Sequence, residues 1–462
     1  MHTGCLRSGT FRDPSLRWGL TVVTARAAPL RPRTCDTEGL LHNEPVKRRV
    51  LQGQCVWPIS PNQARVEGNS ILYTSYDDPF HRPESGYLGL PHVEYEPIPV
   101  EGIITPAFCD WHFHWVQHRI AGVKGKSLLG WLAEDAWPEE ARFGNQAFAD
   151  VAAEGFVRKQ LAAGTLAGAC WCSPHAESVR AAKHAGIRYS LIGPSVMTTG
   201  EPPDLVRPLP QVIAELKQLQ IEFEEQLAVT PRFALSCDMK TLKELQEFAF
   251  DYTLWVQTHL AENEDECAAV ARAFPDAKSY LDVYDQAGLL SPRTLLAHCV
   301  WLDDFDWRTI KQRGSIVVHC PTSNEALGSG RMKLEKVRAM DIPWVLGTDI
   351  GAGPELCMLD TIETVTRIHD WSAPVNTLEA FFRATVSLEM LESYASRKSR
   401  VTRIMGTSRA GFIEFHRPPS IDRSDRDPEH ILDALVDQYR RNPGKSIAAV
   451  YDQNFNLLYE NR

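Results

Sequence analysis

The chain has 462 residues, of which 44% are hydrophobic and 23% are charged, and its formal net charge is −10. This composition is typical of a globular protein, and the acidic balance argues against nucleic acid or an anionic membrane surface as a partner, because both attract basic patches. No apolar run approaches the roughly 18–20 residues needed to cross a bilayer, so we expect no membrane partner. Because the sequence shows no secretory h-region of convincing length, we expect a cytoplasmic protein.

The first 47 residues differ in composition from the rest of the chain. Arginine occurs at six positions between Arg7 and Arg33, and Asp13 is the only acidic residue before Asp36. An arginine-rich, acid-poor start is typical of a transit peptide. We favour a disordered extension over residues 1–47 and keep a transit peptide as the alternative.

Residues 48–105 consist of short apolar pieces interrupted by glycine and proline, which predicts short strands and turns. Two more short strands are predicted near the C-terminus, at 447–451 and 456–459. Because these two regions flank a long central region, we expect 48–105 and 411–462 to form one small β-domain.

In the central region, residues 106–410, strand-like apolar runs alternate with helical or mixed stretches. The eight runs are Ala107–His112, Gly168–Cys172, Tyr189–Leu191, Pro231–Leu235, Leu254–Leu260, Leu295–Val300, Ile316–Cys320 and Trp344–Leu346. The runs are apolar on both faces, as buried parallel strands are. Alternation alone also fits a doubly wound sheet, but polar residues at the strand ends favour a TIM-type (β/α)₈ barrel, whose sites lie at that end.

The strongest local signal is Asp110-Trp-His112-Phe-His114 at the end of the first run. Alternate side chains of a strand share a face, so His112 and His114 project together. A single His-x-His pair is common and indicates little by itself.

The signal becomes strong because the later runs also end on polar groups. His259 ends the fifth run, His298 and His319 lie near the ends of the sixth and seventh, and Asp349 follows the eighth. Such groups are costly at the ends of apolar strands unless they bind metal or pair with one another. Imidazoles and a carboxylate with one open position suit Zn²⁺ or Fe²⁺.

These residues resemble the metal-dependent deaminase branch of the amidohydrolase superfamily, and within it the guanine deaminases. The stretches that carry the resemblance are Asp110–Gln117, Leu128–Leu132, Trp137–Glu140, Pro231–Phe233, Gln257–Glu262, Tyr280–Leu290, Ala297–Val300, His319–Asn324, Leu327–Gly330 and Leu346–Asp349. They extend over more than half of the chain.

The resemblance implies a ligand set of His112, His114, His259 and Asp349. Some members of the superfamily bind two metals through a carboxylated lysine on the fourth strand, but no lysine lies in that run here. One Zn²⁺ per chain is therefore expected.

The resemblance also implies catalytic roles for Glu262, His298 and Asp349, and contacts to a purine-like substrate from Gln117 and Arg232. Asp349 would take a proton from water, Glu262 would carry a proton to a ring nitrogen, and His298 would steady the attacking oxygen. The expected reaction converts guanine and water into xanthine and ammonia.

Several residues keep a second interpretation. Glu262 begins an acidic run, which is usually the solvated start of a helix, and Arg232 has the alternative of pairing with a barrel carboxylate. His319 has the right position, although the resemblance assigns it no metal bond. Trp111 and Trp115 are expected to be packing residues.

The function also keeps alternatives. Residues 352–355 depart from the family pattern, which leaves another amino- or halo-heterocycle, such as a pterin or a triazine, as an alternative substrate. A catalytically silent binding barrel is the other alternative, and the sequence leaves a homodimer open.

Overall fold

The computed structural model describes residues 46–71, 93–122, 125–200, 202–369, 371–387, 390–391, 394–395 and 410–461. The extension predicted for residues 1–47 lies outside the described residues up to position 45. Strand β1 begins at Val46, so the predicted boundary falls two residues inside the first strand. Residues 46–462 form one compact unit.

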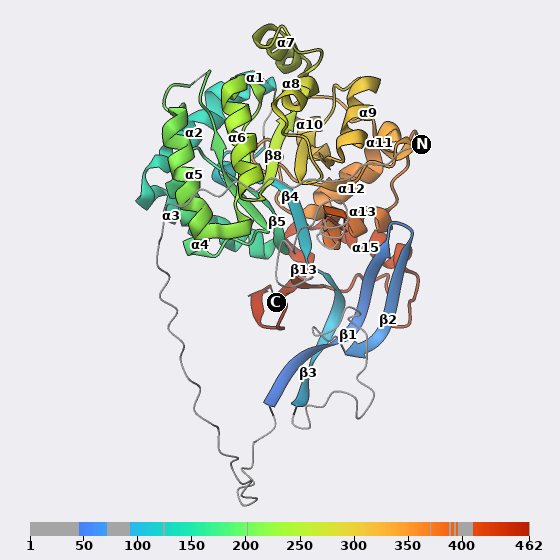
Figure 1. Ribbon diagram of the computed structural model, residues 1–462. Helices are drawn as coiled ribbons and strands as arrows, with labels where there is room; N and C mark the ends of the chain where they lie inside the picture. The colour runs from blue at the N-terminus through green and yellow to red at the C-terminus, as the bar shows by residue number, and fades with distance from the viewer. Residues whose placement is uncertain are drawn as a thin grey trace, which may run out of the picture. The chain divides into compact units, whose positions relative to one another are not determined.

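Eight strands form one parallel sheet in the order of the sequence, with helices around it (Figure 1). They are β4 (Phe108–His114), β5 (Thr165–Cys172), β6 (Leu191–Val196), β7 (Ala228–Pro231), β8 (Trp255–Leu260), β9 (Thr294–His298), β10 (Ile316–His319) and β11 (Trp344–Leu346). The two end strands meet where the Asp349 N–H donates to the carbonyl of His112 over 2.7 Å. The predicted (β/α)₈ barrel is confirmed.

Two of the eight predicted strands are placed wrongly in the sequence. The third strand is Leu191–Val196, because the Gly193-Pro194 pair that is typical of a turn lies inside it. The fourth is Ala228–Pro231, and the apolar residues after Arg232 form a short 3₁₀ helix, Ala234–Ser236. This correction places Arg232 immediately beyond the strand end.

Helices follow the strands and pack their apolar faces on the barrel. The longer ones are α3 (Gln146–Ala162), α4 (Ala176–Ala185), α5 (Leu209–Phe223), α6 (Met239–Asp251), α7 (Glu264–Ala273), α8 (Tyr280–Ala287), α9 (Asp304–Arg313), α12 (Met358–Ile368) and α13 (Thr377–Thr385). In α6 the Asp238 side chain caps the first turn by accepting from the Thr241 N–H, and Leu242, Leu245 and Phe248 form the buried stripe. No helix among the described residues is long and apolar enough to cross a membrane.

A second sheet is built from the segments that flank the barrel in sequence. Its order is β14-β13-β12-β3-β1-β2, from β1 (Val46–Ser60), β2 (Gln63–Ile71), β3 (Val93–Pro106), β12 (Gly411–Phe415), β13 (Ile447–Asp452) and β14 (Leu457–Glu460). Strand β12 pairs antiparallel with β3, which joins the two flanks, and helix α15 (Pro428–Arg441) lies between β12 and β13 in the chain. This confirms the small β-domain, and its exact boundaries remain a prediction.

The expectation of short strands in residues 48–105 was wrong. Strands β1 and β3 have 15 and 14 residues. Strand β1 runs through Gly53 and Pro58 because its pairing with β2 shifts register next to both residues. Such irregularities accommodate glycine and proline within a strand.

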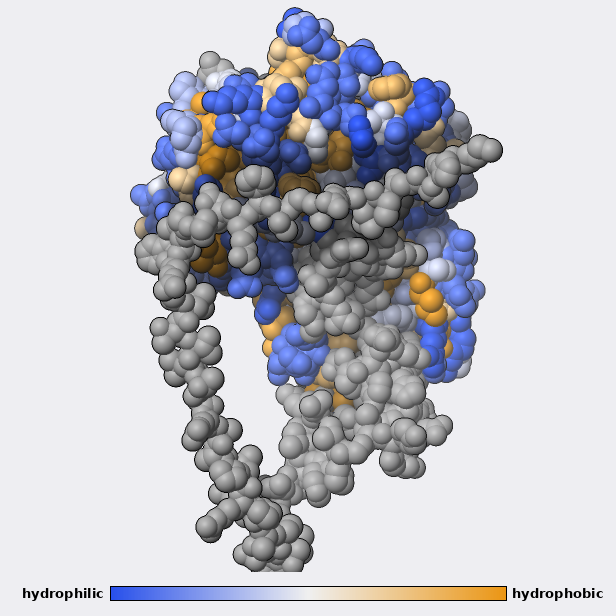
Figure 2. All heavy atoms as spheres, in the orientation of Figure 1, coloured by the Kyte–Doolittle hydropathy of each residue, from blue (hydrophilic) through white to orange (hydrophobic). Residues whose placement is uncertain are grey.

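The fold has a polar exterior and an apolar core. The face shown in Figure 2 is mainly hydrophilic over the described helices, with smaller apolar patches between them. The large apolar side chains that fill the inside of the fold include Trp111, Trp115, Trp171, Trp307 and Trp344, all nearly inaccessible to solvent.

Candidate metal centre and substrate pocket

Histidines at the strand ends converge at one end of the barrel. His112 and His114 lie on the same face of β4, and their ring centroids are 5.0 Å apart. The parallel register pairs His259 on β8 with Ala297 on β9, so the next polar group, His298, lies one residue further on. Four non-glycine residues at this edge have left-handed backbones: Ala261, His298, Cys299 and Asp349, with φ of 48°, 71°, 53° and 52°. Such conformations are strained in residues other than glycine and concentrate at functional sites.

Four of the six distances among the predicted ligand atoms are close to the edge length of a tetrahedral metal site. His114 Nε2 is 3.3 Å from His112 Nε2, 3.2 Å from His259 Nε2 and 3.5 Å from Asp349 Oδ1. His112 Nε2 is 3.3 Å from Asp349 Oδ1. A tetrahedron with metal–ligand bonds of about 2.0–2.1 Å has edges of about 3.3–3.4 Å. The predicted ligands therefore fit a divalent ion such as Zn²⁺.

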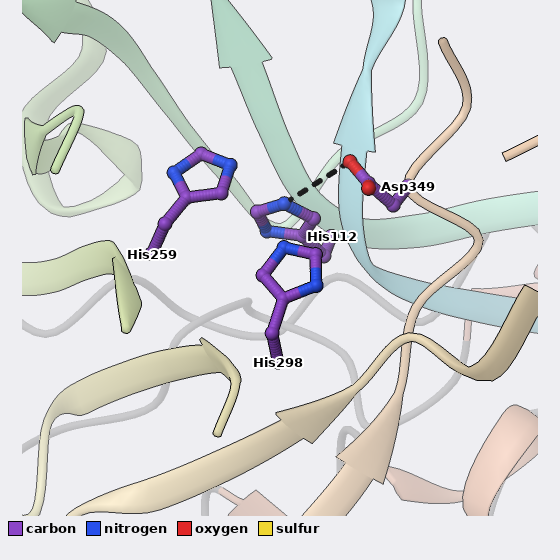
Figure 3. Close-up of side chains that lie close together, drawn as sticks. All are labelled: His112, His259, His298 and Asp349. Carbon is purple, nitrogen blue, oxygen red and sulfur yellow. Dashed lines mark ion pairs between the residues drawn. The ribbon is translucent and has the colours of Figure 1, made fainter. Parts of the chain in front are cut away.

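His298 belongs to an overlapping group with His112, His259 and Asp349, whose ligand atoms all lie within 4.8 Å of one another (Figure 3). The Nδ1 of His298 is 2.9 Å from Asn324 Oδ1, and its Nε2 is 3.5 Å from Glu262 Oε2. The ring is thus oriented toward the carboxylate of Glu262.

The electrostatics suit metal binding, because a ligating imidazole must be neutral. Burial and the neighbouring histidines and Arg232 hold the pKa values of His112, His114 and His259 well below the usual range. The Nδ1 of His259 donates to the Arg232 carbonyl over 2.7 Å, which leaves Nε2 free to bind a metal. Burial raises the pKa of Asp349 to about 6.

A pocket opens onto His114, His259 and Asp349. Its lining comprises His114, Gln117, Leu128, Trp131, Leu132, Arg232, Phe233, His259, Glu262, Glu266, Asp349 and Ala352. Apolar walls with a few convergent polar groups are typical of a small-molecule site. Both residues predicted to contact the substrate line this pocket.

Glu262 is buried against a second acid that the sequence analysis did not select. Glu266 accepts from the backbone N–H of Glu262 over 3.0 Å and from the Tyr280 hydroxyl over 2.7 Å. Burial, then the charges of Asp349 and Glu266, raise the pKa of Glu262 well above the usual range. Glu262 is 3% exposed, so it is not a solvated residue at the helix start.

Gln117 and Arg232 share a carboxylate that the sequence analysis also did not select. Glu140, from the short helix α2 (Trp137–Ala141), accepts from Gln117 Nε2 over 2.6 Å and from Arg232 Nη1 over 2.9 and 2.6 Å. Arg232 therefore pairs with a buried carboxylate, as the alternative interpretation expected, and at the same time lines the pocket.

A match to a family model identifies the protein family of this chain. The model of the amidohydrolase family matches residues 103–387, which include the barrel and all the polar residues described above. The chain belongs to the amidohydrolase family. This confirms the predicted resemblance and the prediction of a hydrolase that acts on C–N bonds.

Known guanine deaminases are similar to this amidohydrolase over more than half of its length. The chain is 33% identical to guanine deaminase from Escherichia coli over 294 residues, which cover 62% of this chain and 67% of the relative. It is 30% identical to guanine deaminase from Pongo abelii over 274 residues, which cover 57% of this chain and 60% of the relative. The solved structure of the E. coli guanine deaminase superimposes with a TM-score of 0.76 at 26% identity, covering 90% of this chain and all of the other.

Of the other aromatic and imidazole residues near the barrel strand ends of this amidohydrolase, Trp171 packs against the proposed metal ligands. Trp171 on β5, which the sequence analysis missed, has its ring centroid 4.4 Å from that of His259 and 4.9 Å from that of His112. His319 is turned to His369, with 3.1 Å between their Nε2 atoms, and belongs to none of the ligand groups. Trp111 and Trp115 are fully buried, as expected of packing residues.

Proposed function

We propose that this amidohydrolase is a deaminase with one Zn²⁺ per chain, which converts guanine and water into xanthine and ammonia. One observation carries the proposal: His114 Nε2 lies within 3.5 Å of the other three predicted ligand atoms, and three of the four ligands line a pocket that also holds Glu262, Gln117 and Arg232. The similarity to guanine deaminases supports the choice of substrate. A cytoplasmic location and a homodimer stay predictions.

The metal is proposed to be single and bound by His112, His114, His259 and Asp349. When bound, Zn²⁺ acts as a Lewis acid and lowers the pKa of coordinated water from about 15.7 toward about 7. Strand β7 has the sequence Ala-Val-Thr-Pro and offers no lysine for a second metal. This supports a mononuclear site.

Two carboxyl groups are proposed to move the protons. Asp349, whose pKa is raised to about 6, accepts a proton from the attacking water. Glu262, whose raised pKa keeps a proton available near neutral pH, donates it to the ring nitrogen next to the amine-bearing carbon. As the C–N bond breaks, the proton that Asp349 took from water leaves with the amine as ammonia, and the remaining hydroxyl proton passes to Glu262 as the carbonyl forms, which restores its acid form. His298, held by Asn324, orients the attacking oxygen.

Gln117 and Arg232 are proposed to bind the edge of the purine. A rigid guanidinium and an amide suit an edge that presents a carbonyl and ring nitrogens. A site that hydrogen-bonds these groups rejects analogues without them, because its buried polar groups are then left unpaired. Adenine, which has no carbonyl, is expected to be a poor substrate.

The test compares Glu262→Gln with Glu264→Gln. Glu264 belongs to the same acidic run but is exposed at the start of α7, so it is a matched control. We expect Glu262→Gln to keep its zinc and to lose about 10²–10⁴-fold in ammonia release from guanine, while Glu264→Gln stays near wild type. Equal activities of the two variants would contradict the role of Glu262.

A panel of substrates separates the alternatives. Zinc-loaded protein that releases ammonia from a pterin or a triazine but not from guanine would show a related hydrolase with another substrate. Zinc-loaded protein that acts on none of them would favour a silent binding barrel. Elemental analysis that finds two metals per active chain would contradict the mononuclear site.

A further inference from the structure

The carboxylate of Glu140 lies behind the pocket, where it touches both proposed recognition residues and is not part of the lining. Its side chain is fully buried. One oxygen accepts from both Gln117 Nε2, at 2.6 Å, and Arg232 Nη1, at 2.9 Å, and the other accepts from Arg232 Nη1 at 2.6 Å. A charge buried this deeply is retained only when it is paired, and here its partners are the two substrate contacts.

These contacts join three segments that are distant in sequence. Gln117 ends the 3₁₀ helix η1 (Trp115–Gln117) after β4, Arg232 follows β7, and Glu140 projects from α2. Since no barrel hydrogen bond links these three positions, the carboxylate fixes the two recognition side chains relative to each other.

Glu140 also determines which end of the Gln117 amide is available to a ligand. A carboxylate only accepts hydrogen bonds, so the amide must turn its NH₂ group to Glu140. The amide oxygen, Oε1, is buried without a hydrogen-bond partner among the described residues. It is therefore an acceptor left for a ligand that carries an N–H group.

Arg232 is left with donors for the same ligand. Its side-chain hydrogen bonds to the described residues go through Nη1 alone, and its side chain is 3% exposed. The Nε and Nη2 groups remain for an acceptor such as a ring carbonyl. Because the charges of Arg232 and Glu140 cancel, the pair adds no net charge to the pocket.

We propose that Glu140 is a positioning residue that sets both the hydrogen-bond pattern and the charge of the pocket. It makes Gln117 an acceptor and Arg232 a donor, and it restricts the ligand to a neutral heterocycle with adjacent carbonyl and N–H groups. Anionic heterocycles are excluded because the guanidinium is already paired. This inference rests on the proposed function and specifies its substrate class.

The experiment compares Glu140→Gln with Glu139→Gln. Glu139 is the adjacent buried acid of the same helix, but it pairs with Arg142 at 2.8 Å and Arg119 at 3.4 Å, which are both partly exposed and outside the pocket. Neutralising Glu139 therefore controls for the loss of a buried negative charge from α2.

Two measurements distinguish positioning from a merely structural role. We expect Glu140→Gln to raise KM for guanine by about 10- to 100-fold, with a smaller change in kcat and unchanged zinc content, because two substrate contacts lose their orientation. We also expect the urate monoanion to inhibit Glu140→Gln at least tenfold more strongly than wild type, because the guanidinium is now unpaired. Glu139→Gln keeps the wild-type values of both.

A double variant and a binding assay keep the proposal falsifiable. In Glu140→Gln/Arg232→Gln no charge is left unpaired, and the gain in urate inhibition disappears if it acts through Arg232. If wild type releases no ammonia from guanine, the proposed function fails, and thermal shifts with guanine and urate still test the preference for neutral over anionic ligands. Equal KM and equal urate inhibition in Glu140→Gln and Glu139→Gln, or urate shifts that do not depend on Glu140, would overturn the proposal.

Discussion

Asp110 is predicted to hold the two end strands of the barrel together at the metal centre. Its carboxylate accepts from the Thr348 N–H over 2.9 Å, from the Thr348 hydroxyl, and from the His112 N–H over 3.2 Å. These contacts join β4, which carries His112 and His114, to the segment that carries Asp349. The backbones at Gly347 and His112 approach each other closely beside these contacts, because a Cβ on Gly347 would be 2.7 Å from His112 Cβ.

The perturbation is Asp110→Ala, with Asp110→Asn as the matched control. Alanine leaves two donors of Thr348, its N–H and its O–H, without an acceptor, and Thr348 is fully buried. Each unsatisfied group costs about 1–3 kcal/mol, which predicts a loss of about 2–6 kcal/mol. Asparagine keeps one acceptor for the N–H, and its NH₂ group can donate to the Thr348 hydroxyl, so we expect a loss below about 1 kcal/mol.

The assay combines urea unfolding of the metal-free protein with zinc binding. We expect Asp110→Ala to lower the unfolding midpoint and to weaken zinc binding by about 10- to 100-fold, because outer-shell partners orient the ligands. Asp110→Asn is expected to stay close to wild type in both. An Asp110→Ala protein with a wild-type midpoint and wild-type zinc affinity would refute the role assigned to Asp110.

Three further predictions concern the pocket, the protein's pH dependence and the metal. Gly351→Ala is expected to raise KM for guanine at least tenfold, because φ of Gly351 is +124° and a Cβ there would lie 2.1 Å from Gln117 Oε1. Gly444→Ala is the control, because a Cβ at Gly444 would have no atom within 4 Å. A wild-type KM for Gly351→Ala would contradict the prediction. Burial raises the pKa of Asp360 to about 6, so its carboxylate destabilises the fold increasingly as pH rises from about 4 to 6. Asp360→Asn is therefore expected to be about 1 kcal/mol more stable than wild type at pH 7, measured by urea unfolding, and no more stable at pH 4. An equal difference in stability at the two pH values would refute the raised pKa. Chelation is expected to abolish activity and lower Tm, and one equivalent of Zn²⁺ restores both; full activity after thorough chelation would exclude the proposed metal.

The sequence predicted the barrel well because its buried parallel strands are apolar on both faces. Strands such as Trp255–Leu260 and Ile316–His319 match the predicted runs within a few residues. The two misplaced strands have a physical explanation. Gly193-Pro194 is typical of a turn but lies inside β6, where the surrounding barrel overrides the local preference. After β7 the apolar residues cover the pocket instead of continuing the strand.

The candidate site was predictable where its residues occupy strand ends and not where they come from other segments. Glu140 and Trp171 reach the site from a short helix and a neighbouring strand, and spacing in the sequence gives no sign of such contacts. Asp110 carried a usable signal: it alternates with His112 and His114, so it shares their face of β4. A buried carboxylate on the same face as two proposed metal ligands indicates a supporting role, which the hydrogen bonds to Thr348 then identify.

His298 and His319 show where the reasoning from strand ends reaches its limit. Both lie at the last position of a barrel strand, and both are fully buried. Their positions in the strand pattern therefore do not distinguish a functional histidine from a structural one. Their partners separate them. His298 is held by Asn324 and directs its other nitrogen to Glu262, whereas His319 directs its Nε2 to His369, which contacts Arg331. The Nε2 of His319 is thus occupied by a second imidazole outside the pocket, and this contact comes from a helix end about 50 residues away. The role of a strand-end histidine is therefore decided by what the following helices bring against it, which the strand pattern alone does not contain.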